Sequence, residues 1–356
     1  VSNSKMYILL SGLGENMKEA MALMENVINH AKADREAYDR FVSTTLKSRK
    51  DNKLDQKTNF QALQTYGMYG PYNAFRNVPS STELEQKDPQ QLVDLIASLK
   101  NYKHSVIYYG PMELKQLIAT IDKGHAVAKK LQDAPAAKYY TKQQTPQTEV
   151  LLAPYDAKNI YMMQYSNDGK KWNPAEQPVI TVFNEYFGGG MNGVVFQELR
   201  ESRGLAYSAY ADYSTPNRQS DTDYAMTYII SQNDKMSDCI RVFNDIIDTL
   251  PQSEQSFELA KQATSKRIAS ERITKTGIIF SYLSNKERGI NYDIRRNIYD
   301  ALPNLTLKDV VNFEKNNFAG KTWRYIILGD EKNLDMKALE KLGTIKRVST
   351  EEIFGY

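Results

Sequence analysis

Apolar residues recur at helical spacing in two stretches of the chain, and a short apolar run precedes each stretch. The first stretch begins near Met17 and the second near Met236, and in both the apolar side chains follow at intervals of three and four residues. Such spacing places them on one face of a helix. The runs at residues 6–11 and 226–231 have polar flanks, and we predict a strand at each of them.

The two stretches are related by one constant shift along the sequence. The shift is 219 residues for three pairs of positions: Met17 and Met236, Tyr38 and Phe257, Gly110 and Gly329. The last pair ends two segments that each predict a helix followed by a strand, the first of these strands at residues 106–110. One shift shared by three separate pairs indicates a tandem duplication, which dictates the architecture of the chain.

The first copy is shorter than the second at its beginning. The second copy starts near Glu149 and spends roughly 75 residues before Met226, whereas only five residues precede Met6. We therefore expect a truncated first domain, a polar linker and a complete second domain, over residues 1–137, 138–148 and 149–356. On this interpretation the chain is a fragment of a longer polypeptide. The alternative is a first domain that evolved without the opening section.

The second copy mixes strand and helix patterns, which predicts an α+β fold. Gly204 suits the end of a helix because glycine adopts the left-handed conformation without steric cost. In the strand that follows, alternation places Tyr207 and Tyr213 on one face and Tyr210 on the other. Strands are predicted at 149–154, 159–166, 205–214, 224–231 and 323–328, helices at 178–187 and 192–202, and three or more helices after residue 231.

The most specific motif is the segment 186–208, which reads Tyr-Phe-Gly-Gly-Gly-Met-Asn-Gly-Val-Val-Phe-Gln-Glu-Leu-Arg-Glu-Ser-Arg-Gly-Leu-Ala-Tyr-Ser. Its glycine-rich loop, its helix ending in Leu-Arg and its Arg-Gly-Leu-Ala-Tyr entry to a strand resemble the second domain of each half of pitrilysin/insulinase family zinc peptidases. With the repeat, the resemblance covers nearly the whole chain. It implies two tandem homologous α/β sandwich domains of the pitrilysin/insulinase (LuxS/metallohydrolase-like) type, the first truncated at its N-terminus.

Members of that family consist of two halves that close around a chamber for an unfolded peptide. Catalysis there requires an inverted zinc motif, His-x-x-Glu-His, in the N-terminal half. This chain has three histidines, His30, His104 and His125, and none lies in such a motif. The resemblance therefore implies the C-terminal, non-catalytic half, inactive alone and without a cofactor of its own. Zinc is expected in a partner N-terminal half, on the same polypeptide or a separate subunit.

The resemblance also implies which residues face the substrate. In such halves an Arg and a Tyr seven residues apart reach toward the substrate carbonyl, and Arg200 and Tyr207 have this spacing. The alternatives are a cation that complements a helix C-terminus, for Arg200, and a core tyrosine, for Tyr207. Gly188, Gly189 and Gly190 are expected in a loop near the chamber, where they permit tight packing or mobility. No Gly-Lys-Ser/Thr follows them, which argues against a phosphate loop.

Charge and composition exclude other classes of partner. The formal net charge is +3 and the basic residues are interspersed with acidic ones, so nucleic acid is not expected. No apolar run reaches the roughly 18 residues of a membrane span. The single cysteine, Cys239, fits a buried helical position. The expected partners are the catalytic half and a peptide substrate, and the resemblance suggests a periplasmic or cell-envelope location.

Two rival functions remain open at this stage. The first is a structural subunit that resembles the core proteins which respiratory complexes recruited from this peptidase fold. The second is an unrelated α/β binding protein. Degenerate zinc motifs in both halves would favour the structural subunit, whereas a complete His-x-x-Glu-His in an N-terminal half would favour the peptidase.

Overall fold

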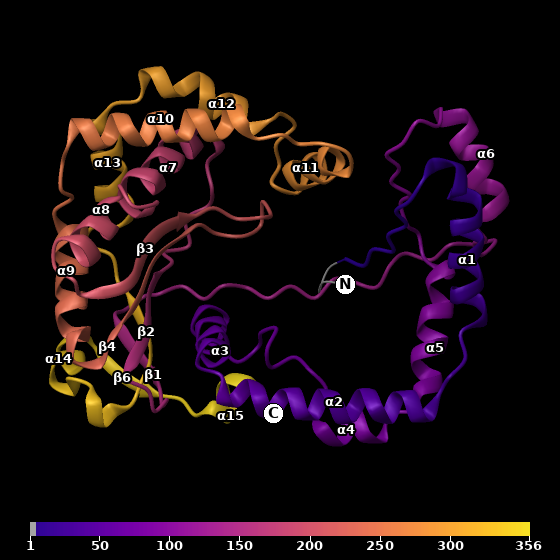
Figure 1. Ribbon diagram of the computed structural model, residues 1–356, viewed down its shortest axis with the longest axis horizontal. Coiled ribbons are helices and arrows are strands. Elements are labelled where there is room, and N and C mark those ends of the chain that lie inside the picture. The colour runs from indigo at the N-terminus through magenta and orange to yellow at the C-terminus, as the bar shows by residue number, and fades with distance from the viewer. Residues whose placement is uncertain (1–4) are drawn as a thin grey trace. The chain divides into compact units, whose positions relative to one another are not determined.

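The computed structural model describes residues 5–356, and contacts between residues divide it into two units (Figure 1). The first unit comprises the chain up to Asp51 with residues 79–139 and 274–279. The second comprises residues 52–78, 140–273 and 280–356. The predicted break near residue 138 lies close to one of these boundaries. The predicted division differs in that residues 52–78 group with the second unit.

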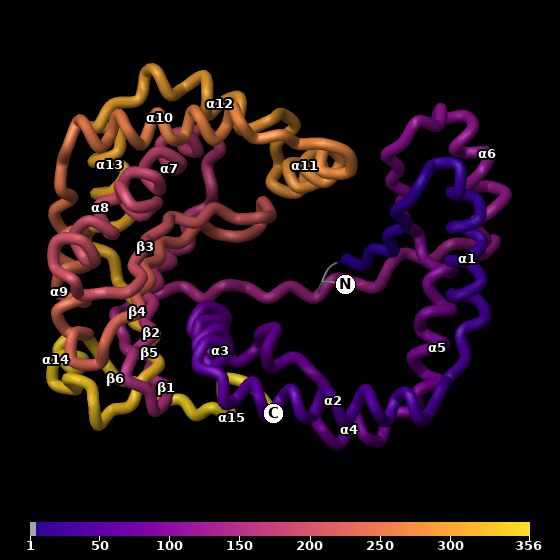
Figure 2. The backbone as a smooth tube through the Cα atoms, in the orientation of Figure 1, coloured from indigo at the N-terminus to yellow at the C-terminus, as the bar shows by residue number. Residues whose placement is uncertain are grey.

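A mixed sheet forms the centre of the second unit. Within residues 5–356 it contains six strands in the order β3-β4-β2-β5-β1-β6. β1 runs parallel to β5 and β6, whereas β2 runs antiparallel to β4 and β5, and β3 runs antiparallel to β4. Figure 2 follows the backbone through these strands. The strands span Glu149–Ala153 (β1), Asn159–Ser166 (β2), Ala206–Ser214 (β3), Tyr224–Gln232 (β4), Arg324–Leu328 (β5) and Thr344–Arg347 (β6). The α+β fold expected from the sequence is confirmed.

Helices cover one face of this sheet and enclose the larger core. Val182, Phe183 and Phe243 are fully buried there together with Met162 and Ile327 of the sheet. The helical segments of this layer and its connections are η3 (Pro174–Glu176), α7 (Gln177–Phe183), η4 (Asn184–Gly188), α8 (Val194–Phe196), η5 (Gln197–Glu201), η6 (Asn233–Lys235), α9 (Met236–Asp248), α10 (Glu254–Ser270), α12 (Ile294–Ala301), η7 (Leu302–Asn304), α13 (Leu307–Asn317), η8 (Glu331–Asn333) and α14 (Met336–Leu342). A further helix, α11 (Thr276–Glu287), begins in the first unit and continues into the second, and none of its residues is buried.

The opposite face of the sheet packs on α3 (Gln56–Tyr69) and α15 (Thr350–Phe354). Phe60 and Leu63 of α3 are buried against Met163 and Ile326 of the sheet. Gly67 lets the helix lie close, because a β-carbon there would stand 2.5 Å from the Ile326 side chain. This burial explains why α3, although early in the chain, belongs to the second unit.

The first unit is helical. Its segments are η1 (Gly14–Asn16), α1 (Met17–His30), α2 (Arg35–Leu54, which extends into the second unit), α4 (Ser81–Gln86), α5 (Pro89–Ala97), η2 (Ser98–Asn101) and α6 (Leu114–Gly124). α1 and α9 begin 219 residues apart, and so do α2 and α10. The predicted shift therefore relates the starts of two helix pairs. The duplication as a whole stays a prediction.

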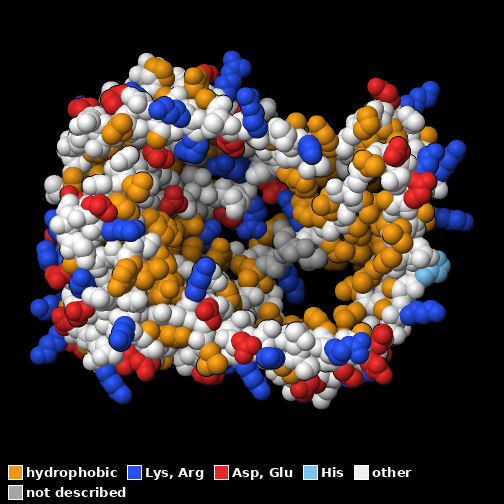
Figure 3. All heavy atoms as spheres, viewed as in Figure 1, with side chains coloured by type: hydrophobic (Ala, Val, Ile, Leu, Met, Phe, Trp, Pro, Cys, Tyr) orange, Lys and Arg blue, Asp and Glu red, His pale blue; other side chains and the backbone are white. Residues whose placement is uncertain are grey.

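Two strands predicted for the first copy are wrong. Residues 6–11 and 106–110 form neither helix nor strand, and Leu9 and Val106 are exposed. Their counterparts in the second unit, β4 and β5, each lie between two neighbouring strands. The described part of the first unit offers no such neighbours, and a strand without a ladder leaves its backbone groups unpaired. Apolar side chains consequently gather at the surface of this unit (Figure 3).

None of the helices described between residues 5 and 356 is long and apolar enough to cross a membrane.

Candidate functional site

Arg200 lies in the π-helical segment η5, directly before the chain turns into β3. Its guanidinium carbon is 5.0 Å from the centre of the Phe196 ring, and its Nε is 4.0 Å from Glu201 Oε1. The side chain is 51% exposed. Gly204 has φ +57° and its N–H donates to the Arg200 carbonyl at 3.0 Å, which confirms the predicted glycine stop. The guanidinium is thus held on an aromatic ring but remains accessible.

Tyr207 is the extra residue of a β-bulge. Ala206 pairs with Ser231 and Ser208 with Ile230, so Tyr207 has no partner of its own on β4. The bulge shifts the alternation by one residue, and the prediction that Tyr207 shares a face with Tyr213 is wrong. Tyr207 is 58% exposed, whereas Tyr213 is 4% exposed. The sequence gives no sign of the bulge, since small residues flank Tyr207 on both sides.

The glycines of the predicted loop pack against the edge of the sheet. A β-carbon on Gly188 would overlap with the carbonyl group of Ala211 in β3, and one on Gly189 would stand 2.9 Å from the Asn184 carbonyl oxygen. Gly190 has φ +65°, a conformation that other residues rarely adopt. Close packing, one of the two expected roles, therefore accounts for Gly188 and Gly189. Their place near a substrate chamber stays a prediction.

Asn184 in the same π-helical turn binds the backbone of the edge strand. Its amide oxygen accepts from the Tyr213 N–H at 2.9 Å, and its amide nitrogen donates to the Tyr213 carbonyl at 3.1 Å and to Asp212 Oδ1 at 2.8 Å. One side-chain amide thereby occupies both backbone groups of Tyr213. The outer edge of β3 therefore has no free backbone hydrogen-bonding group at Tyr213.

A partly buried polar cluster includes the Tyr213 side chain of β3 and Asp223, the residue before β4. The Tyr213 hydroxyl donates to Asp223 Oδ2 at 3.3 Å, and Lys170 Nζ donates to Glu176 at 2.8 Å and to Asn317 at 3.0 Å. Loss of water raises the pKa of Asp223 to about 6, and the Lys170 charge opposes that shift. Sequence reasoning missed this cluster because its members are scattered polar residues without a motif.

The three histidines lie outside the predicted site. His30 is the last residue of α1, where its Nδ1 is 3.1 Å from the Asn26 carbonyl oxygen. The rings of His104 and His125 meet, with their Nε2 atoms 2.8 Å apart. No group of three or more His, Cys, Asp or Glu residues within the described range is arranged to hold a metal ion. Cys239 is buried in α9, as its apolar helical pattern predicts.

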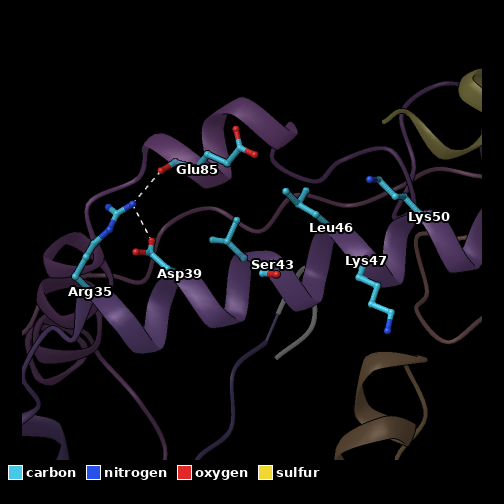
Figure 4. A pocket seen from close by; sticks show the side chains of 8 residues that line it. Arg35, Asp39, Ser43, Leu46, Lys47, Lys50 and Glu85 are labelled. Carbon is cyan, nitrogen blue, oxygen red and sulfur yellow. Dashed lines mark hydrogen bonds and ion pairs between the residues drawn. The ribbon is translucent and has the colours of Figure 1, made fainter.

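An open pocket of about 520 Å³ runs along α2 in the first unit (Figure 4). Arg35 fills one end, where it binds Asp39 at 2.9 Å and the Glu85 carbonyl at 3.3 Å. Lys47 and Lys50 line the other part together with Leu46. Charges of both signs line it without converging on one point, and no predicted site residue reaches it.

Comparisons with known proteins agree with this fold. Residues 89–264 match a family model described as the peptidase M16 inactive domain. No curated protein sequence matches the chain. One similar solved structure is the peptidase M16 inactive domain from Pseudomonas fluorescens, with a TM-score of 0.64 and 14% identity over 89% of this chain and 76% of that one. A conserved protein from Enterococcus faecalis has a TM-score of 0.67 and 13% identity over 90% of this chain and 76% of its own. The periplasmic protease PqqL from Escherichia coli has a TM-score of 0.63 and 14% identity over 89% of this chain and 35% of its own.

Fold and family match together define a non-catalytic half of a peptidase-family protein. The chain belongs to the peptidase M16 family, in which it is a C-terminal half of the inactive kind. The resemblance stated from the glycine-rich motif is thereby confirmed. The family match includes that motif, since residues 186–208 lie within the matched range.

Proposed function

We propose that this half lines the substrate chamber of a zinc peptidase and binds the peptide through Arg200 and Tyr207. The observation that carries the proposal is the exposure of both side chains on either side of the Gly204 turn. The bulge supports it, because it releases Tyr207 from the ladder and from the buried face that Tyr213 occupies. A core tyrosine, the alternative interpretation, does not fit a side chain that is more than half exposed.

The chemistry of the pair suits a peptide carbonyl. A guanidinium and a phenol both donate hydrogen bonds, and donors aimed at a carbonyl oxygen stabilise the negative charge that develops there during hydrolysis. The residues of this chain do not fit the peptidase zinc motif, since its three histidines are far from the His-x-x-Glu-His spacing. Metal, water and general base therefore belong to the partner half in this proposal.

The test uses the chain assembled with its catalytic half. Arg200→Ala and Tyr207→Phe each remove donors to the carbonyl oxygen, and we expect kcat/KM for peptide hydrolysis to fall by about tenfold or more. Two neighbours serve as matched controls. Arg203 is bound to Glu198, and the ring centres of Tyr210 and Tyr228 lie 4.9 Å apart in a stacked pair. Arg203→Ala and Tyr210→Phe should therefore leave kcat/KM nearly unchanged. A loss of less than about twofold in both test variants contradicts the proposal.

A role in assembly is the second candidate function. The apolar surface of the first unit favours it, because contiguous exposed apolar side chains mark interaction sites. An assembly subunit would keep its partner while neither Arg200 nor Tyr207 affected turnover. The same variants, scored for co-purification with the partner as well as for kcat/KM, separate the two functions.

We also propose a periplasmic location. The support is the likeness to PqqL, which is described as a periplasmic protease. Fractionation of cells that express the full-length protein tests the location, and recovery in the cytoplasmic fraction contradicts it.

A further inference from the structure

Three segments of the first unit bring two histidines and a glutamate together. Glu25 lies on α1, His125 directly follows α6, and His104 follows η2. The His125 Nδ1 is 2.5 Å from Glu25 Oε1, and the His104 Nδ1 is 2.8 Å from the Tyr102 carbonyl oxygen. The two Nε2 atoms face each other at 2.8 Å, with the ring planes at 79°.

The hydrogen bonds fix which ring nitrogens carry hydrogen. A backbone carbonyl only accepts, so the His104 Nδ1 must donate to Tyr102. An ionised carboxylate also only accepts, so the His125 Nδ1 must donate to Glu25. A neutral imidazole carries one hydrogen, and both Nε2 atoms are then bare. Two lone pairs that face each other at 2.8 Å repel, and a cation between them removes the conflict.

We propose that His104 and His125 bind a divalent transition-metal cation, of which Zn²⁺ is the test case, through their Nε2 atoms. Imidazole nitrogen is a preferred ligand of zinc, at about 2.0–2.1 Å. Two such bonds at a tetrahedral angle separate the nitrogens by about 3.3 Å, so the rings need to part by only about half an ångström. Water completes the coordination, which makes the site exchangeable and weak compared with a resident cofactor.

The surroundings are those that metal-binding histidines require. Such a histidine donates its second N–H to a carboxylate or a backbone carbonyl, which orients the ring, and here Glu25 and Tyr102 accept these bonds. The Glu25 carboxylate also offsets the charge of the cation. The positions are fixed by packing: α6 ends against α1, where a β-carbon on Gly124 would stand 3.1 Å from the Met21 side chain. Lys103 N–H donates to the Gln132 carbonyl at 2.8 Å, which holds the segment beside His104.

Calorimetric titration of the complete chain with ZnCl₂, after removal of any purification tag, tests the site. We expect one Zn²⁺ per chain, and at least a tenfold loss of affinity in His104→Gln and in His125→Gln. Glu25→Gln should weaken binding by about 10–100-fold, since it removes the carboxylate that orients His125 and offsets the charge of the cation. The remaining histidine supplies the matched control: His30→Gln should bind as the original chain does, because His30 ends α1 and bonds only to Asn26 in the described contacts.

Thermal unfolding supplies a second measurement. A cation that links the segments of His104 and His125 raises the Tm of the original chain and of His30→Gln with increasing ZnCl₂, but not that of His104→Gln. This comparison remains informative if a variant is itself less stable. A chain that binds no Zn²⁺ overturns the proposal, and so does equal loss of affinity in His30→Gln. A proton shared between the two Nε2 atoms, seen by NMR in a chain that takes up no metal, also overturns it.

Discussion

Single residues decide where this fold departs from its sequence pattern. The predicted strand at 205–214 exists as β3, but one extra residue in the ladder moves Tyr207 off the buried face that it was predicted to share with Tyr213. A bulge depends on the pairing partner and not on the strand's own residues, so alternation cannot reveal it. The glycine at 204, in contrast, was predictable, because the left-handed conformation is a property of the residue itself.

Glu314 on α13 gives the second unit a pH dependence of stability. The side chain is 1% exposed and its Oε1 has no hydrogen-bond partner in the described structure. Loss of water, and then the charge of Asp248, raises the pKa of Glu314 from 4.5 to about 7. The folded state thus holds a proton that the unfolded state has released between these two values. The contribution of Glu314 to stability is greatest below pH 4.5, declines toward pH 7 and stays low above it.

Glu314→Gln should remove that decline. The amide keeps the shape of the protonated acid without a charge. At pH 8 the free energy of unfolding of the variant should therefore exceed that of the original chain by about 1–3 kcal/mol. At pH 5 the two proteins should differ much less. Urea unfolding at both pH values measures the difference, and comparison within each pH cancels the titration of other groups such as Asp223. Equal differences at pH 5 and pH 8 contradict this assignment.

At the scale of elements, helices form where the sequence predicts them, whereas two of the predicted strands do not form. α1 and α9 begin at the two methionines from which the shift was read, because an amphipathic helix satisfies its backbone by itself. The strand patterns at 6–11 and 106–110 are as apolar as those of β4 and β5, yet only the latter have neighbours to pair with. The apolar pattern of a segment indicates its preference for strand structure, whereas a strand forms only where a neighbouring strand can pair with it.

Hydrogen exchange should separate these equivalent segments. Amides of β4 and β5 are paired on both sides and should exchange slowly, whereas those of residues 6–11 and 106–110 should exchange quickly. Each segment of the second unit is the internal control for its counterpart in the first. Mass spectrometry of peptic fragments measures all four in one sample. Equal protection in counterparts would show that the first unit pairs its strands as well.

At the scale of the whole molecule, the family could be identified from the motif and the repeat, whereas the grouping of α3 could not. Residues 52–78 precede Glu149, the first residue of the sheet that they cover, by 71 to 97 positions, and contacts so distant leave no periodic trace. Arg200 and Tyr207 were proposed through resemblance, and their role stays a prediction. The Asp223 cluster and the His104–His125 pair were not found, since both consist of residues that are unremarkable until the fold assembles them.

The chain alone should not hydrolyse peptides, even with zinc added. It lacks the His-x-x-Glu-His spacing that places two ligands and a base at one metal ion. A fluorogenic peptide assay with and without the catalytic half measures this directly, and activity should appear only in the assembled protein. Hydrolysis by the chain alone that a chelator abolishes and that survives repeated purification would contradict the assignment as a non-catalytic half.

The amide of Asn184 has a consequence for solubility. A sheet with a bare outer strand can template the addition of another molecule, which begins domain exchange and fibre growth. Here the side chain occupies both hydrogen-bonding groups of Tyr213, and Gly188 brings the main chain against Ala211 beside it. A single turn of π-helix therefore covers this part of the outer strand β3 and hinders the addition of a second copy there.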